Sequence, residues 1–427
     1  MMNGKNLYLF YVFTIYLFLL LLSPFIVLLY FTHSRVKKEI NQRVFNLKNI
    51  AVNSDESLPT IWFHASSIGE MKLSMQLIKA LQKKTKANVI LSVFTATAYE
   101  MGKEYKNLNG FFLLPLDLPF LMNRLVKKIN PDFLFTVESE FWPVLVNTVK
   151  KNGGEVILVN GRISEKAYKN HTKNPLFLKT TLSFYDSCLM RSDEDAQRIG
   201  DFIDKKKVKV LGNIKYSVET INKGEKPYFY LSDNSYITFI STREGEEELL
   251  LNAMVKKGKK ILDNKKVKII IAPRHIIRVP EIEELLKSLE LPYIKFSEKT
   301  LPHEDYEIVL VDIFGVLMDC LSISQGAFIG GSLVEKGGQN LLEPISQGIP
   351  IVFGNDMSNF QEEADFFLQH GAEMCQTAGE VIDVFEEWTL SPEKAKAKGA
   401  TLQKALETKS NTIEKYVQEI TALLPSK

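Results

Sequence analysis

From about residue 58 onward, short apolar runs alternate with longer amphipathic stretches along the chain. The apolar runs have no polar face, and the stretches between them have the spacing of helices with one buried side. Strands that are apolar on both faces and separated by helices are typical of a parallel sheet covered by helices on both sides. The pattern predicts strands within residues 60–65, 88–94, 110–115, 132–138, 155–161 and 187–192, and a second series within 236–242, 267–273, 293–297, 307–312, 326–331 and 349–354.

The two series of strands are separated by a polar, turn-rich stretch at residues 217–235, which is interpreted as a linker. A chain of 427 residues is long enough for two domains. We therefore expect an α/β protein with two Rossmann-like, doubly wound domains that face a cleft. The domains are placed at residues 58–218 and 234–390, and a helical segment rich in Ala, Lys, Leu and Glu follows at 391–427.

The N-terminal segment differs from the rest, because residues 7–31 contain no charged side chain. A helix of this length, at about 1.5 Å per residue, reaches about 37 Å and can cross a hydrocarbon core of about 30 Å. Basic residues follow the segment at Arg35, Lys37, Lys38, Arg43 and Lys48, whereas only Lys5 precedes it. The positive-inside rule then predicts a single-pass anchor with the body in the cytoplasm.

Two other interpretations of residues 7–31 are a cleaved signal peptide and a helix that lies in the membrane interface. A cleaved signal peptide would have a shorter apolar region that ends in small residues, and this one ends in VLLYFTHSRVKK. A helix that lies in the membrane interface normally has a polar face, which this segment lacks. The membrane-crossing anchor is therefore the prediction.

The overall composition is that of an ordinary globular protein, with 45% hydrophobic and 24% charged residues. A formal net charge of +2 gives no basic footprint for nucleic acid. The three cysteines, Cys188, Cys320 and Cys375, form no CxxC pair, which suits a reducing compartment and argues against a disulfide framework or a zinc site.

Candidate site residues follow the predicted strands, because open α/β sheets bind ligands at the carboxyl ends of their strands. Glu70 follows the first strand and Gly69, on the first turn of a predicted helix. A carboxylate there can simply be stabilised by the helix dipole, or it can act as a general base. Four more charged residues follow strands: Glu138, Glu140, Arg162 and Lys215. The two glutamates can instead be ordinary acidic residues at a helix start, and the two basic residues can instead form surface salt bridges. His64 lies inside a strand and is interpreted as a core histidine.

The second half has its own candidates. Arg274 follows a strand, where it can grip phosphate or form a surface salt bridge. The glycine pairs at 330–331 and 337–338 precede a helix predicted to begin near Asn340, so their N–H groups are expected to approach an anion. Asn340 and Glu343 are expected on one face of its first turn, where Glu343 accepts hydrogen bonds from a sugar diol or caps the helix. Neither GxGxxG after the first strand nor GxxxxGK[ST] is present.

Seven segments in this order, HASSIGE, ESEFWP, NGRIS, GNIKYS, STREGEEE, APRH and FIGGSLVEKGGQNLLEPISQGIPIVFG, resemble the Kdo transferase family from about Ile61 to Gly371. Members of this family move 3-deoxy-D-manno-oct-2-ulosonic acid (Kdo) from CMP-Kdo onto lipid A precursor. The resemblance implies the glycosyltransferase B fold, with the acceptor on the N-terminal domain and the CMP-sugar on the C-terminal one. It also implies inversion at the anomeric carbon, no metal ion and no cofactor beyond the donor substrate CMP-Kdo.

The resemblance assigns roles to individual residues. Glu70 matches the catalytic base, and Glu138 and Lys215 match groups that assist at the transition state. Lys215 can contact either the departing phosphate or the Kdo carboxylate. The residues that match CMP contacts are Pro273, Arg274, Phe314, Gly315, Val316, Asn340, Leu341, Leu342 and Glu343. Arg274, Lys215 and the amides near Gly337–Gly338 are expected to stabilise the departing phosphate.

The chain departs from the family pattern at a few positions. Phe314, Gly315 and Val316 stand where Met-Gly-Glu is usual, so a carboxylate contact at 316 is absent. Gln339 replaces the usual His, and Gly161 and Lys166 alter the NARLSER-like run. None of these changes removes a catalytic group.

The expected partners are CMP-Kdo, lipid A precursor and the cytoplasmic face of the cell inner membrane. Three other functions stay open at this stage: a B-fold transferase that uses a UDP-sugar and a lipid acceptor, a B-fold epimerase, and a membrane-tethered scaffold with a dead site. An epimerase has no use for a membrane anchor, and the intact candidate residues disfavour a dead scaffold.

Overall fold

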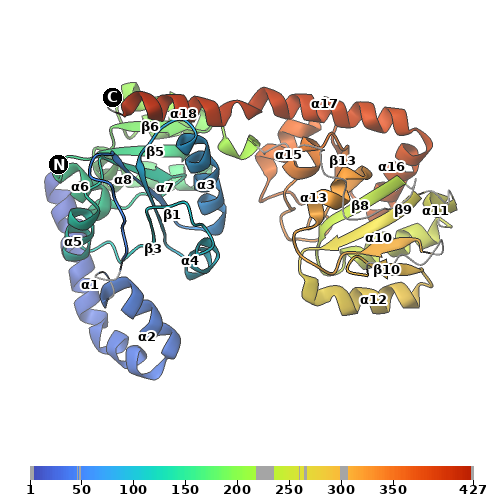
Figure 1. Cartoon of the computed structure of the whole chain (residues 1–427), viewed down its shortest axis with the longest axis horizontal. Helices are drawn as coiled ribbons and strands as arrows, with labels where there is room; N and C mark the ends of the chain where they lie inside the picture. Colours follow the sequence, from blue (N-terminus) through green and yellow to red (C-terminus); the bar gives the residue numbers. More distant parts are fainter. Residues whose placement is uncertain are drawn as a thin grey trace. The chain divides into compact units, whose positions relative to one another are not determined.

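The computed structural model describes residues 4–45, 47, 50–217, 235–258, 260–263, 267–298 and 306–424 (Figure 1). It divides the chain into two compact units, Met1–Ser217 with Asn411–Lys427, and Val218–Ser410. Most of the predicted linker at 217–235 lies outside the described residues.

Unit 1 is built on a seven-stranded sheet in which every paired strand is parallel. Its order is β3-β2-β1-β4-β5-β6-β7. The strands are β1 (Thr60–Ala65), β2 (Asn88–Val93), β3 (Gly110–Leu113), β4 (Phe133–Val137), β5 (Glu155–Gly161), β6 (Ser187–Met190) and β7 (Val208–Val210). The pattern of apolar runs missed β7, because this strand closes the edge of the sheet and Lys209 and Val210 are exposed.

Helices cover both faces of this sheet. Alternate residues of β1 enter different apolar clusters: Trp62 packs with the helices on one face, and Ile61 and Phe63 pack with those on the other. The helices are α3 (Ile68–Gln82), α4 (Ala96–Gly102), α5 (Pro119–Ile129), α6 (Pro143–Lys151), α7 (Glu165–Lys173), α8 (Pro175–Leu182), α9 (Asp193–Gly200) and α18 (Thr412–Leu423), with short 3₁₀ turns at Lys205–Lys207 and Ile214–Tyr216.

The chain begins with the long apolar helix α1 (Gly4–Thr32), followed by α2 (Ser34–Ile40) and a π-helical turn, Asn41–Phe45. Residues Tyr8–Thr32 are long and apolar enough to cross a membrane by length and composition, with a mean hydropathy of 2.7. Tyr8, Tyr11, Val12, Ile15 and Leu19 nevertheless pack against the core of unit 1.

Unit 2 repeats the architecture with a second seven-stranded parallel sheet, in the order β10-β11-β9-β8-β12-β13-β14. Its strands are β8 (Ser235–Thr242), β9 (Val267–Pro273), β10 (Tyr293–Lys295), β11 (Ile308–Leu310), β12 (Ser324–Ile329), β13 (Ile351–Phe353) and β14 (Glu373–Met374). Its helices are α10 (Glu246–Lys256), α11 (Lys260–Asp263), α12 (Val279–Ser288), α13 (Leu317–Ser322), α14 (Leu342–Ser346), α15 (Gln361–Leu368), α16 (Ala378–Leu390) and α17 (Pro392–Ser410), with a 3₁₀ turn at Ile276–Arg278.

The predicted helical segment at 391–427 is divided between the units. Helix α17 belongs to unit 2, whereas α18 returns to unit 1, where Tyr416, Val417 and Ile420 join the cluster that contains α3. Tyr416 also donates a hydrogen bond to the carbonyl of Gly212 at 3.1 Å.

Both sheets are doubly wound, which confirms the predicted fold class. In unit 1 the chain runs from β1 outward to β3 and then returns to β4 on the other side of β1, so the order reverses between β1 and β4. In unit 2 the corresponding reversal lies between β8 and β12. A crevice forms at the carboxyl ends of the strands at such a switch point, and this is where open α/β sheets bind ligands.

Candidate active site

Glu70 lies at the switch point of unit 1, directly after β1. Ser67 caps helix α3 by accepting from the N–H of Glu70 at 3.3 Å, and the Glu70 carboxylate accepts from the N–H of Ser66 at 2.7 Å and from the Ser67 hydroxyl at 2.9 Å. Ser67 and Glu70 therefore cap the start of the helix reciprocally, much as in a capping box. The alternative that the sequence offered for Glu70 was stabilisation by the helix dipole, which acts at the same position. The cap fixes the carboxylate at the carboxyl end of β1, so it also positions a base at this edge of the sheet.

Glu140, which follows β4, is linked to Glu70 through Ser66. The Ser66 hydroxyl donates to Glu140, and the indole N–H of Trp142 donates to the same carboxylate at 2.7 Å. His64 is fully buried in β1, and its Nε2 atom lies 3.7 Å from Glu140 Oε2. As predicted for a core histidine, the Nδ1 atom has a polar partner, the Ser92 hydroxyl at 3.0 Å. The Nε2 atom, in contrast, has no hydrogen-bond partner among the described residues.

The two carboxylates differ in their proton affinity. Burial raises the pKa of Glu70, and the negative charge of Glu140 raises it further, which outweighs the hydrogen bonds from Ser66 and Ser67. Burial also acts to raise the pKa of Glu140, but the interactions with His64, Ser66 and Trp142 outweigh it and lower that pKa. Glu140 therefore stays ionised while Glu70 holds its proton to a higher pH, a division that suits Glu70 as the proton acceptor.

We expect this coupling to appear in the pH profile of activity. If Glu70 is the base that the family resemblance assigns, it works in its ionised form, so kcat/KM should rise as the pH passes upward through the pKa of Glu70. The change Glu140→Gln keeps an acceptor for Ser66 and removes the negative charge, so the acid limb of the profile should move to lower pH. An acid limb that stays in place would contradict the coupling.

Glu138 and Lys215 form the other part of the cluster. Glu138 directly follows β4 and has a left-handed φ of +57°, a strained conformation for a non-glycine residue that often marks a functional site. Its Oε1 atom lies 3.6 Å from Lys215 Nζ. Buried Asn160 accepts from the N–H of Ile214 at 3.0 Å, and Asn213 accepts from the N–H of Lys215 at 3.1 Å, so both fix the turn that carries the lysine.

Unit 2 has a cationic cluster at the carboxyl ends of β8 and β9. Arg243 Nη1 lies 2.8 Å from His275 Nε2. Burial lowers the pKa of His275, and the positive charges of Arg243, Arg274 and Arg278 lower it further. Arg278 is held by Glu247 at 2.9 Å, whereas Arg274 is exposed. The buried Nε of Arg243 has no hydrogen-bond partner among the described residues.

The glycine loop after β12 does not present its N–H groups to a ligand, which corrects the expectation for Gly330–Gly331 and Gly337–Gly338. The fully buried carboxylate of Glu246 accepts from the N–H of Gly331 at 2.6 Å and from those of Ser332 and Leu333, each at 3.0 Å. Gly337 donates to Asp356 at 2.6 Å, and Gly338 donates to the carbonyl of Gly331 at 2.8 Å. The protein's own acceptors therefore occupy the amides that we expected to bind phosphate.

The remaining predicted donor contacts lie on the loop after β11 and around the start of helix α14. Phe314 is 78% exposed, and Gly315 has a left-handed φ of +90°, so the loop after β11 presents an open aromatic ring. Helix α14 begins at Leu342, later than predicted, so Asn340 precedes the helix and accepts from the N–H of Leu342 at 3.1 Å. Leu341 and Leu342 are buried, which leaves Asn340 and Glu343 as the side chains that can reach a ligand.

The structure brings Glu70, Glu138 and Lys215 together in unit 1. In unit 2 the predicted residues follow different strands of one parallel sheet: Pro273 and Arg274 come at the end of β9, the 314–316 loop follows β11, and the 340–343 segment follows the glycine loop after β12. Nothing in the sequence singles out Arg243, or assigns Glu140 a role in setting the pKa of Glu70. Both residues lie in motifs that carry the family resemblance, STREGEEE and ESEFWP, but only packing shows what they contact.

Comparison with known proteins places the chain among Kdo transferases. The family model for 3-deoxy-D-manno-octulosonic-acid transferase (kdotransferase) matches residues 38–218. A 3-deoxy-D-manno-octulosonic acid transferase of Aquifex aeolicus is 31% identical over 358 residues, which cover 81% of this chain and 93% of that protein. A bifunctional glycosyltransferase/methyltransferase of Fusobacterium nucleatum is 35% identical over 351 residues, but the match spans only 53% of its length and 79% of this chain.

Among solved structures, UDP-GlcNAc 2-epimerase from Neisseria meningitidis, bound to UDP-GlcNAc, matches with a TM-score of 0.56. The match covers 85% of this chain and all of that one, at 12% sequence identity. At so low an identity the similarity shows the fold alone.

Proposed function

Because the chain belongs to the 3-deoxy-D-manno-octulosonic acid (Kdo) transferase family, we propose that it transfers Kdo from CMP-Kdo onto lipid A precursor, lipid IVA, with Glu70 as the general base. Membership of the family makes the protein a glycosyltransferase of lipopolysaccharide synthesis. The observation that carries the assignment of the base is the raised pKa of Glu70 at the switch point of unit 1.

The proposed reaction is a single inverting displacement. A hydroxyl of the acceptor attacks the anomeric carbon of Kdo while its proton passes to Glu70, and the bond from that carbon to the phosphate oxygen breaks so that CMP departs with the electron pair. Lys215, which Glu138 orients at 3.6 Å, supplies positive charge to the phosphate or to the sugar carboxylate. A carboxylate base in hydrogen-bond reach contributes typically about 10²–10⁴ to such a rate.

The donor is proposed to bind unit 2 through side-chain cations rather than through the glycine loop. Arg243 and Arg274 supply charge at the ends of β8 and β9, and guanidinium groups bind phosphate with two parallel hydrogen bonds. This cationic cluster supports charge stabilisation without a metal ion. Full activity in the presence of a chelator is the expected result.

The direct test is to supply purified protein with lipid IVA, Kdo, CTP and the coupling synthetase, and to weigh the lipid product by mass spectrometry. A mass increase of one or more Kdo units is expected. An unchanged lipid, with the same mixture active when a known Kdo transferase replaces this protein, would refute the proposed acceptor.

The second candidate is a B-fold transferase that uses a UDP-sugar and a lipid acceptor, because the fold alone is shared with proteins that bind UDP-sugars. The native state is stabilised only by a nucleotide that it binds. We therefore expect CMP to raise the melting temperature and UDP to leave it unchanged. The reverse result would favour the UDP-sugar alternative.

Glu343 is expected to bind the ribose of CMP from the first turn of α14. A hydrogen bond to a charged acceptor contributes about 1.5–3 kcal/mol, so Glu343→Ala should weaken CMP binding by roughly ten- to a hundredfold. Titration calorimetry and a melting curve on the same variant separate this role from a structural one. An unchanged dissociation constant with a lowered melting temperature would assign Glu343 to helix capping.

A further inference from the structure

Helix α1 has two different faces, although its sequence is apolar all round. The partly covered side chains follow one stripe, which includes Tyr8, Val12, Ile15 and Leu19 and continues to Tyr30. These spacings of three and four residues place them on one side of the helix. The opposite side is widely exposed: Phe13, Phe18 and Leu21 are 61%, 62% and 69% exposed.

The first half of the covered stripe, from Tyr8 to Leu19, packs against the core of unit 1. The ring of Tyr11 lies 5.3 Å from that of Phe177 in α8, and the ring of Tyr8 lies 6.1 Å from that of Phe184. Lys151, at the end of α6, places its Nζ 5.6 Å from the Tyr8 ring. Towards the other end of α1, Tyr30 donates to Asn41 at 2.9 Å.

The chain also returns to unit 1 directly after α2. Arg43 is 8% exposed, and its guanidinium donates to the carbonyl of Leu114 at 3.0 Å. The start of α1 and the segment that follows α2 are therefore both attached to the same body (Figure 1). A helix that crossed the bilayer would have to leave this body, or carry α8 with Lys179 into hydrocarbon, at about 2.5–3.5 kcal/mol for a lysine at the centre.

We propose that α1 does not cross the membrane but lies in the interface of one leaflet, with its covered stripe on unit 1 and its exposed apolar face among the lipids. The sequence disfavoured an interfacial helix because α1 has no polar face. The structure answers this objection over the first half of α1, where Tyr8, Tyr11, Val12, Ile15 and Leu19 pack against unit 1 and so need not face water. An interfacial helix buries its apolar face about 5–10 Å into the boundary of headgroups and acyl chains.

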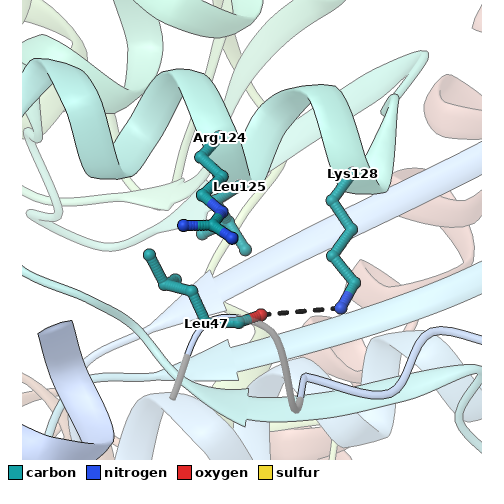
Figure 2. A pocket seen from close by; sticks show the side chains of 4 residues that line it. All are labelled: Leu47, Arg124, Leu125 and Lys128. Carbon is teal, nitrogen blue, oxygen red and sulfur yellow. Dashed lines mark hydrogen bonds between the residues drawn. The ribbon is translucent and has the colours of Figure 1, made fainter. Parts of the chain in front are cut away.

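Basic side chains on neighbouring segments indicate that the bound surface is anionic. Lys37 and Lys38 are exposed on α2, and Arg124 and Lys128, one helical turn apart on α5, line a pocket of about 230 Å³ with Leu47 and Leu125. Figure 2 shows both cations reaching from α5 toward Leu47, whose carbonyl accepts from Lys128 at 3.5 Å. Two cations beside apolar walls fit the phosphate and first acyl carbons of an anionic phospholipid. The interfacial position of α1 and the headgroup pocket are both independent of the proposed reaction.

The decisive test asks whether α1 stays docked in the membrane. The double variant Tyr11→Cys/Phe177→Cys, treated with a short bismaleimide on native membranes, should acquire one bridging reagent by intact mass. The native cysteines are all buried, so they add little background. The matched pair Phe13→Cys/Phe177→Cys, with Phe13 on the exposed face, should react without bridging. Failure of the first pair to bridge on membranes, or equal bridging in both pairs, would overturn the proposal.

A second measurement uses the unsubstituted chain with one epitope tag at each end. In sealed vesicles of known orientation, protease should remove both tags from the same side. Removal of the C-terminal tag while the N-terminal tag is protected would show that α1 crosses the bilayer.

The pocket is tested by flotation with vesicles of phosphatidylcholine alone or mixed with phosphatidylglycerol. Arg124→Gln/Lys128→Gln should weaken the preference for the mixed vesicles by about tenfold, since cations near an anionic surface each contribute to binding. The control Lys79→Gln/Lys83→Gln removes two exposed cations at the same spacing from the C-terminal end of α3. Equal losses in both variants, or none in the first, would overturn the headgroup site.

Discussion

Replacing Glu70 with glutamine should lower turnover by roughly 10²–10⁴ and leave CMP binding intact. The amide keeps the size of the side chain and an oxygen that can accept from the N–H of Ser66, but it cannot take a proton from the acceptor hydroxyl. Single-turnover kinetics with CMP-Kdo and lipid acceptor measure the loss, and titration calorimetry measures CMP binding.

The chain provides a matched control in a second capping box. Glu380, on the first turn of α16, accepts from the N–H of Gln376 at 2.7 Å, and its own N–H donates to Thr377 at 3.3 Å. These distances equal those of Glu70 with Ser66 and Ser67. Glu380→Gln should therefore reproduce any loss of helix capping and leave turnover unchanged. Equal turnover in the Glu70→Gln and Glu380→Gln variants would show that Glu70 only caps its helix and is not the base.

These two boxes show what the sequence could and could not predict about the site. SIGE at 67–70 and TAGE at 377–380 have the same pattern, and each begins a helix. The predicted place of Glu70 on a first helical turn is correct, and Glu380 occupies the same position in α16. It cannot show that Glu70 is partly buried beside Glu140 whereas Glu380 is exposed, because that difference depends on which strands lie next to each other.

The fold could be predicted because it depends on apolar runs that are visible in the sequence, whereas the surroundings of Glu70 depend on contacts between distant segments. Central strands such as β1, β5 and β9 are almost continuously apolar, so their residues alone identify them as 60–65, 155–161 and 267–273. Edge strands β7 and β14 are short and partly exposed, and they gave no such signal. The partner of the glycine loop could not be predicted from the sequence either. Glycine pairs predict accessible N–H groups, but they do not show that the carboxylate of Glu246 accepts hydrogen bonds from them.

That carboxylate carries the second large expected effect, on the stability of unit 2. Glu246 accepts from the N–H groups of Arg243, Gly331, Ser332 and Leu333, at distances from 2.6 to 3.0 Å. Glu246→Ala leaves these buried donors without their acceptor, so we expect a loss of about 3–5 kcal/mol in the free energy of unfolding, and a melting temperature lower by roughly 10 °C.

The glycine loop connects β12 to the segment that begins at Asn340, so the same change should also weaken CMP binding. Glu248→Ala is the matched control, because Glu248 lies on the same helical turn of α10 but is exposed. Calorimetric melting of both variants, with hydrogen exchange across residues 330–338, measures the effect. If Glu246→Ala melts like Glu248→Ala and its loop amides stay protected, the carboxylate does not hold the loop. If it melts early and exchange accelerates in the loop, the glycines serve to bring the three amides of Gly331, Ser332 and Leu333 onto one buried carboxylate. Phosphate binding is then left to Arg243 and Arg274.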